Sequence, residues 1–319
     1  MSLPQCVFRC FKRLERFGDR ITGAAGPYFV GLAIILIGAA IVCCLDVVIF
    51  NLPWPWLTVP PCLLIIVNLA THYYLVCTTP PGFVNEPPAQ PGSGLLWATK
   101  RDPRSQRHLT GTLSWSYLSR PRAEDPPLSD MQQMRAEVRP PLPRVNQCVG
   151  LYNERHFVLF MAYLVIGSFW YSVLGWPYLM DALGLRFDSE WAYHVPAVLY
   201  MVMYMLSVVM CLAVGTMLAW HLWSVAQGET SVENHDHEHY RKVAKTRGET
   251  FVNSYDLGKW KNLKLFFNIG PEGYSWTTLV LPLRIQPYTD GRSWARRPGH
   301  DRHHGVRQGE ELTDEEEEG

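Results

Sequence analysis

Four long apolar runs alternate with polar stretches along the chain. They extend over roughly 28–50, 57–76, 157–180 and 195–225. Each run approaches or exceeds the ~20 mostly apolar residues that a helix needs to cross a bilayer, which is more than an ordinary core helix requires. The pattern therefore predicts an all-α membrane protein with four transmembrane helices, two within 27–78 and two within 157–225.

The ends of the first two runs carry residues typical of membrane interfaces and helix stops. A short turn with two tryptophans, which prefer interfacial depth, joins these runs. Asp46 lies near the end of the first run, and we place it at the interface because burying a carboxylate in hydrocarbon costs a few kcal/mol. Pro80, Pro81 and Gly82 follow the second run and cannot continue its helix.

The basic residues are distributed unevenly over the polar stretches. Five of the 29 Lys and Arg residues lie in 1–26, ten in 79–156, one between the third and fourth runs, and thirteen after Ala226. Cytosolic loops carry an excess of Lys and Arg, so this distribution places both termini and the 79–156 loop in the cytosol. The segment 1–26 is predicted to be cytosolic and amphipathic, either a basic helix on an anionic membrane surface or a solvated helix start.

The remaining polar stretches differ in how much order they predict. Residues 83–145 are rich in Pro, Arg, Ser, Gly and Gln, show no sustained periodicity, and are predicted to be disordered. The stretch 292–319 is basic and then acidic, and is predicted to be a disordered tail. Residues 226–291 form a cytosolic C-terminal segment, in which an amphipathic interfacial helix is expected to continue through Phe267.

The cysteine and histidine residues do not indicate a disulfide framework or a metal site. The eight cysteines show neither a disulfide framework nor the spacing of a zinc ribbon, and a reducing cytosolic face suits them. His235, His237 and His239 alternate, which puts them on different faces of a helix, so a solvated charged connector is favoured over a metal site. We expect membrane lipid as a partner and no nucleic acid.

One motif joins the polar loop to the third apolar run. It reads Asn146-Gln147-Cys148-Val149-Gly150, with Asn153 three residues further on. The stretch resembles the end of the cysteine-rich domain of DHHC-type protein S-palmitoyltransferases, where an Asn-Asn-Cys-Val-Gly run and a downstream Asn lead into the third transmembrane helix. Gln147 stands in place of the second Asn.

Three further motifs carry the same resemblance. A Pro-Pro-Gly turn after the second run is similar to the family's Asp-Pro-Gly motif, and a Thr-Ser-Val-Glu run after the fourth is similar to its Thr-Thr-x-Glu motif and also has the pattern of a capping box. Near the C-terminus, the spacing of Asn253, Tyr255, Gly258 and Asn262 resembles the family's Asn-x-Tyr-x-x-Gly-x-x-x-Asn segment. In the family this segment binds the third and fourth helices to the cytosolic core. The scaffold residues that the resemblance implies are Pro80, Pro81, Gly82, Asn146, Gly150, Asn153, Thr230, Ser231, Glu233, Asn253, Tyr255, Gly258 and Asn262.

The resemblance implies a membrane-bound protein-cysteine S-palmitoyltransferase of the ER or Golgi. In that family a motif cysteine, activated as a thiolate by a neighbouring histidine, takes palmitate from palmitoyl-CoA and passes it to cysteines of substrate proteins. Structural zinc holds the cysteine-rich domain. The fatty chain lies among the transmembrane helices.

The segment that should carry this chemistry is replaced in this sequence. Where the family has an Asp-His-His-Cys run, the chain reads Arg-Pro-Pro-Leu-Pro-Arg-Val over 139–145. No catalytic residue can be assigned, and Cys148 matches a family zinc ligand whose partners are missing, so we expect no zinc. Three explanations follow: a splice form or gene-model variant of an active enzyme, a pseudoenzyme that binds lipid or partners, and an unrelated four-helix membrane scaffold or transporter.

Overall fold

The computed structural model describes residues 27–81, 97–98, 149–185, 191–230, 233–271, 273–289, 294–300 and 303–307. The chain divides into two compact units. We call Met1–Pro81 with Val138–Thr216 the membrane unit, and Gly82–Glu137 with Met217–Gly319 the tail unit. Within the described ranges the structure is helical, and extended pairing is limited to three isolated bridges.

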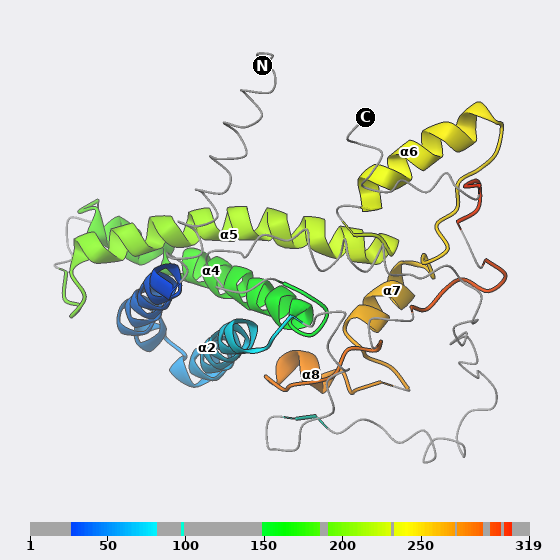
Figure 1. Cartoon of the computed structure of the whole chain (residues 1–319). Coiled ribbons are helices and arrows are strands. Elements are labelled where there is room, and N and C mark those ends of the chain that lie inside the picture. Colours follow the sequence, from blue (N-terminus) through cyan, green and yellow to red (C-terminus); the bar gives the residue numbers. More distant parts are fainter. Residues whose placement is uncertain are drawn as a thin grey trace, which may run out of the picture. The chain divides into compact units, whose positions relative to one another are not determined.

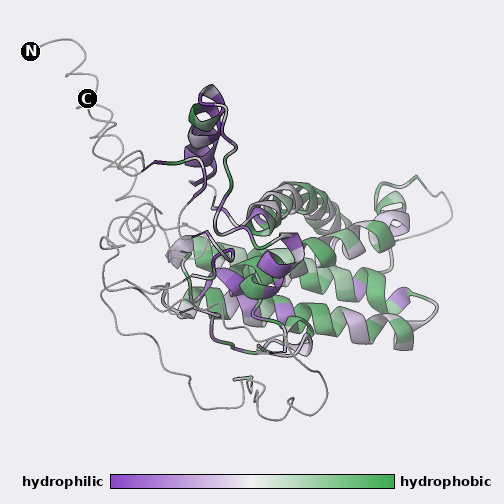
Figure 2. Ribbon diagram, turned by 90° about the vertical axis from the view of Figure 1, so that its right-hand side faces the viewer, coloured by the Kyte–Doolittle hydropathy of each residue, from purple (hydrophilic) through white to green (hydrophobic). Residues whose placement is uncertain are grey.

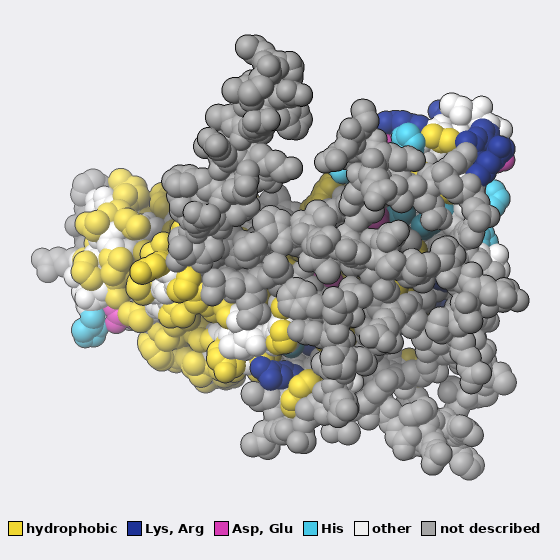
Figure 3. Space-filling view, viewed as in Figure 1, with side chains coloured by type: hydrophobic (Ala, Val, Ile, Leu, Met, Phe, Trp, Pro, Cys, Tyr) yellow, Lys and Arg dark blue, Asp and Glu magenta, His cyan; other side chains and the backbone are white. Residues whose placement is uncertain are grey.

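Four helices are long and apolar enough to cross a membrane, as the hydropathy pattern predicted. They are Pro27–Asn51, α2 (Pro55–Thr78), α4 (Glu154–Ala182) and α5 (Ala197–Gln227). Figure 1 shows α2 and α4 packed along each other, and Figure 2 shows that the membrane helices are mostly apolar with some polar residues among them. Large hydrophobic side chains remain exposed on all four, and Figure 3 shows them gathered over the membrane unit. Such all-round apolar surfaces are typical of helices that face lipid.

The first helix ends in two tighter turns before the chain reverses. After Cys43 it continues as the π-helix η1 (Cys44–Val48) and the 3₁₀ helix η2 (Ile49–Asn51). The Asn51 side chain donates hydrogen bonds to the carbonyl oxygens of Asp46 (2.8 Å) and Val47 (3.1 Å), which lack helical partners at this end. Because α2 then begins at Pro55, the hairpin has the short turn that the sequence predicted.

Buried tyrosines join α4 to α5 inside the membrane unit. The Tyr200 hydroxyl donates to the Gly175 carbonyl (2.8 Å), and the Tyr204 hydroxyl donates to the Ser172 carbonyl (2.8 Å). A Cβ atom at Gly175 would lie 2.7 Å from the Tyr200 hydroxyl, so glycine is needed for this close approach. Small residues at helix contacts and hydrogen bonds between helices are the usual means of association in lipid.

The tail unit consists of short helices and connecting segments. Its helices are α6 (Glu233–Thr246), α7 (Lys259–Phe266) and α8 (Thr277–Val280), and the last turns of α5 also belong to it. Unlike the membrane helices, α6 is mostly polar (Figure 2), and only one face of it is buried.

The structure describes parts of two stretches for which the sequence predicts disorder, and these parts lie in the tail unit. Within 292–319, the segments 294–300 and 303–307 bond to the chain around residue 252: Arg297 N–H donates to the Ser254 carbonyl (2.7 Å), and Val252 and His304 exchange two backbone bonds of 3.1 Å. Within 83–145, Ala98 N–H donates to the Arg284 carbonyl (2.9 Å). The other residues of both stretches, and all of 1–26, lie outside the described residues.

Candidate functional site

The C-terminal end of α5 is closed by two asparagine side chains. The last carbonyls of a helix have no intrahelical donors and must find others. The Asn262 amide donates to the Ala226 carbonyl (2.9 Å), and the Asn253 amide donates to the carbonyls of Gln227 (3.5 Å) and Gly228 (3.2 Å). Asn253 and Asn262 thus bind the downstream segment to the end of the fourth membrane helix.

The same two asparagines also order the segment that carries them. The Asn253 side-chain oxygen accepts from Tyr255 N–H (2.9 Å), and that of Asn262 accepts from Leu257 N–H (3.1 Å). Gly258 follows with φ 99°, in the left-handed region that favours glycine, and α7 begins at the next residue. The spacing of Asn253, Tyr255, Gly258 and Asn262 therefore reflects one local structure. In it each asparagine donates to a carbonyl at the end of α5 and accepts from a backbone N–H of its own segment.

The turn into α6 contains a capping box. Thr230 N–H donates to the Glu233 carboxylate (2.8 Å), while Glu233 N–H donates to the Thr230 hydroxyl (3.3 Å). These are the two reciprocal bonds that the Ser/Thr-x-x-Glu pattern predicts. Ser231, the second residue of the proposed motif, lies outside the described residues.

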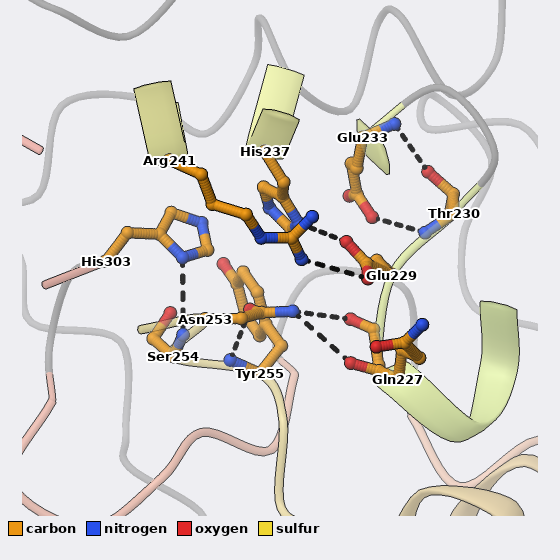
Figure 4. Close-up of polar contacts among 11 residues, drawn as sticks. Gln227, Glu229, Thr230, Glu233, His237, Arg241, Asn253, Ser254, Tyr255 and His303 are labelled. Carbon is orange, nitrogen blue, oxygen red and sulfur yellow. Dashed lines mark hydrogen bonds and ion pairs between the residues drawn. The ribbon is translucent and has the colours of Figure 1, made fainter. Parts of the chain in front are cut away.

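A buried ion pair lies beside this capping box (Figure 4). The Nδ1 atom of His237 is 2.6 Å from the Glu229 carboxylate, and the side chains of both residues are 4% exposed. Arg241, one turn further along α6, places its guanidinium 3.4 Å from the other oxygen of Glu229. A buried carboxylate is costly unless it is paired and hydrogen-bonded, and here two basic side chains of one helix provide both.

The prediction that 235–239 is a solvated connector is wrong for His237. In α6 this residue lies on the buried face with Tyr240 and Ala244, whereas His235 and His239 are exposed. The sequence contained the signal, since positions 237, 240 and 244 have the spacing of one helix face. Because the run was judged by the alternation of its histidines, Glu229, His237 and Arg241 were missed.

Aromatic rings and His303 cover the ion pair. The ring centroid of His237 lies 5.1 Å from that of Phe251 and 5.1 Å from that of His303. The Arg241 guanidinium lies 5.7 Å from the Phe251 ring centroid. The Nδ1 atom of His303 accepts a hydrogen bond from Ser254 N–H (3.2 Å), which requires an unprotonated Nδ1. Burial lowers the pKa of His303 to about 4, and repulsion from His237 acts in the same direction.

In the membrane unit, the Pro80-Pro81 turn meets the turn before α4. Asn153 accepts from Gly150 N–H (2.7 Å) and donates to the Thr79 carbonyl (3.3 Å), while Tyr152 N–H donates to the Pro81 carbonyl (3.3 Å). A Cβ atom at Gly150 would lie 2.6 Å from the Pro81 carbonyl oxygen, so only glycine fits. Pro80 itself is exposed.

A buried histidine pair lies in the same unit and was also missed from the sequence. The Nδ1 atoms of His72 on α2 and His156 on α4 are 3.2 Å apart, and the residues are 0% and 3% exposed. The Tyr163 ring stacks on His72 with a centroid distance of 6.0 Å. Since one Nδ1 must donate and the other accept, the pair requires at least one neutral imidazole.

The remaining predicted site residues are not part of this geometry. Gly82, Asn146 and Cys148 lie outside the described residues. Among the residues that the structure does describe, no three His, Cys, Asp or Glu side chains could hold a metal ion.

Comparisons with known proteins bear on these motifs. A DHHC palmitoyltransferase family profile matches residues 143–238. Palmitoyltransferase ZDHHC16A of Danio rerio is 26% identical over 198 residues, which are 48% of this chain and 50% of the relative. Human palmitoyltransferase ZDHHC16 is 25% identical over 173 residues (47% and 46%), and ZDHHC16B of Danio rerio is 25% identical over 321 residues (86% and 78%).

The four apolar helices of this chain make it an all-α multi-pass membrane protein. Residues 143–238 are similar to the DHHC palmitoyltransferase family, and the relatives named above are palmitoyltransferases of 25–26% identity. The chain spans about half the length of the first curated relatives that it matches.

Proposed function

We propose that this protein keeps the membrane architecture of a DHHC-type palmitoyltransferase but, as written, does not transfer palmitate. The observation that carries the proposal is the sequence at 139–145, where Arg-Pro-Pro-Leu-Pro-Arg-Val stands in place of the Asp-His-His-Cys run. The family match begins at residue 143, next to the point where the family-like sequence resumes. The similarity to palmitoyltransferases supports palmitoyl-CoA and membrane lipid as ligands.

Covalent acyl transfer needs a thiol held beside a base. Within the 79–156 loop the sequence has one cysteine, Cys148. The next histidine along the chain is His156. His156 is buried in α4, where its Nδ1 is engaged with His72. The Nδ1 atom of His156 is thus already engaged, and acyl transfer is sensitive to how its groups are held, because a small misplacement of a nucleophile costs orders of magnitude in rate.

The test is acyl labelling of the purified full-length chain with palmitoyl-CoA, read as hydroxylamine-sensitive label. Cys148→Ala is compared with Cys6→Ala as a matched control, and labelled protein is chased with a peptide thiol. We expect weak labelling that is similar in both variants and does not chase onto the peptide. Labelling that is lost in Cys148→Ala alone and chases onto the peptide would establish Cys148 as a working nucleophile and refute the proposal.

A second candidate is that the intact product of the same gene is an active enzyme and that this chain is a splice form or gene-model variant. The abrupt change at 145–146 favours it, because the residues on both sides of the 83–145 segment remain family-like. Sequencing transcripts across this segment tests it. Recovery of a Cys- and His-rich exon would support it, whereas transcripts that all encode 83–145 as written would leave a lipid- or partner-binding pseudoenzyme.

The proposed location is an ER or Golgi membrane, with both termini and the 79–156 loop in the cytosol. The distribution of the basic residues supports this orientation. Protease protection of tagged termini in sealed microsomes tests it: both tags should be cleaved, and shielding of either tag would reverse the assignment.

A further inference from the structure

The exposed side of α7 combines tryptophan with lysine. Lys259, Trp260, Lys261 and Lys264 are all exposed, and Trp260 is 79% exposed. Trp260 and Lys264 are four residues apart and therefore neighbours on one helix face. An indole ring beside ammonium groups suits a membrane interface, where tryptophan lies at the level of the headgroups and lysine meets their negative charge.

The other side of α7 is fixed to the last turns of α5 within the tail unit. Asn262 donates to the Ala226 carbonyl (2.9 Å), the Lys259 ammonium lies 4.8 Å from the Trp223 ring centroid, and the rings of Phe266 and His221 are 6.3 Å apart. These contacts come from the first, middle and last turns of the helix. Its exposed side therefore has a defined position beside the end of α5.

The end of α5 indicates what surrounds that position. Trp220 and Trp223 belong to a helix apolar enough to span a bilayer, and their side chains are 59% and 53% exposed. Tryptophans at the ends of spanning helices lie at the level of the lipid headgroups. Since Lys259 contacts Trp223, α7 begins at this same level.

We propose that the exposed face of α7 binds the headgroups of anionic phospholipids. The helix carries three lysines and no acidic residue. The carboxylate nearest in sequence, Asp256, accepts hydrogen bonds from Gly258 N–H and the Asn262 amide, on the side of α7 that faces α5. Among the described residues, the lysines of α7 form no ion pair with an acidic side chain. Each lysine near an anionic membrane surface strengthens binding to that surface about fivefold.

The experiment uses the full-length chain in lipid nanodiscs that contain a minor fraction of brominated lipid, either phosphatidylserine or phosphatidylcholine. Subtracting the quenching of Trp260→Phe from that of the wild type isolates the contribution of Trp260. We expect this contribution to be at least about twofold larger with brominated phosphatidylserine. Raising the salt to about 0.5 M should remove most of the difference, because screening then acts over a few ångströms.

Charge reversal locates the effect on α7. Lys264→Glu should reduce the preference for phosphatidylserine, and the Lys261→Glu/Lys264→Glu double variant should abolish it. Lys245→Glu makes the same charge change at an exposed position of α6 and should leave the preference unchanged. All of these side chains are exposed, so the fold should tolerate the changes.

Two results would overturn the proposal. Equal quenching by both brominated lipids would show an interfacial helix with no selectivity for anionic headgroups. Quenching by neither lipid would leave this face to an acidic protein partner. Neither result depends on whether the chain transfers palmitate, so this test and the acyl-labelling test can fail separately.

Discussion

Different interactions stabilise the inside of the membrane unit and the inside of the tail unit. In the membrane unit the long helices pack through aromatic rings and close backbone contacts, and polar bonds such as Tyr200 to Gly175 supplement the packing. In the tail unit the helices are short and polar, and a buried ion pair with asparagine side chains connects them. Short helices are marginal in isolation, so their order depends on such contacts. Single polar deletions should therefore be more damaging in the tail unit.

The largest effect is expected from His237→Ala. It leaves the Glu229 carboxylate buried with only Arg241 close to it, and breaking a buried pair costs about 3–5 kcal/mol. Hydrogen exchange in α6 should become fast while exchange in α2 and α4 stays slow. His239→Ala, two residues further on and exposed, is the matched control and should change little. Equal effects of the two substitutions would show that the ion pair does not hold this unit together.

Asn262→Ala tests the connection between α5 and the segment after it. The change leaves the Ala226 carbonyl and Leu257 N–H without their side-chain partner, for which we expect a loss of about 1–3 kcal/mol in the tail unit. Thermal unfolding in detergent measures it. Asn234→Ala, on the polar α6, is the comparison, and a melting temperature for Asn262→Ala no lower than that of Asn234→Ala would contradict the proposed cap.

The tail unit should also lose stability in mild acid. The folded pKa of His303 is about 4, below the ordinary 6.5, so the unfolded chain binds more protons between these values. The stabilisation is fully present above pH 6.5 and is lost as the pH falls to about 4, by about 2 kcal/mol for a partly exposed group. Comparing the wild type with His303→Gln over this range isolates the effect. Parallel pH profiles of the two proteins would exclude His303 as the cause.

The smallest effect is expected from Tyr200→Phe in the membrane unit. It removes one hydroxyl that is fully buried and bonded to the Gly175 carbonyl, while the ring and its packing remain. Hydrogen bonds between membrane helices average about 0.6 kcal/mol. Unfolding in detergent should therefore shift only slightly. A loss as large as that of His237→Ala would reverse the contrast between the two units.

What the sequence could predict follows from the range of the forces involved. The four membrane helices were predictable because a bilayer imposes a length and composition that a local window can detect. The capping box was predictable because both of its partners lie within four residues. The His72–His156 pair joins residues 84 positions apart, and Ser254 meets His303 across 49, so no local pattern indicated either contact. His237 was misjudged because the alternation of the three histidines was weighed without the spacing of His237, Tyr240 and Ala244, which marks one helix face.

The contact between Pro81 and Gly150 has a consequence for how this chain can evolve. Tyr152 N–H bonds to the Pro81 carbonyl, and Gly150 lies against the same residue, so the polypeptide leaves the membrane unit and returns to it at one place. Because Pro81 and Gly150 are in contact, a loop of any sufficient length between them can close without distorting α2 or α4. Each doubling of the loop length costs only about 0.6 kcal/mol of closure entropy. The stretch between them is thus an interchangeable module: it can be lengthened, shortened or exchanged for unrelated sequence while α2 and α4 keep their places.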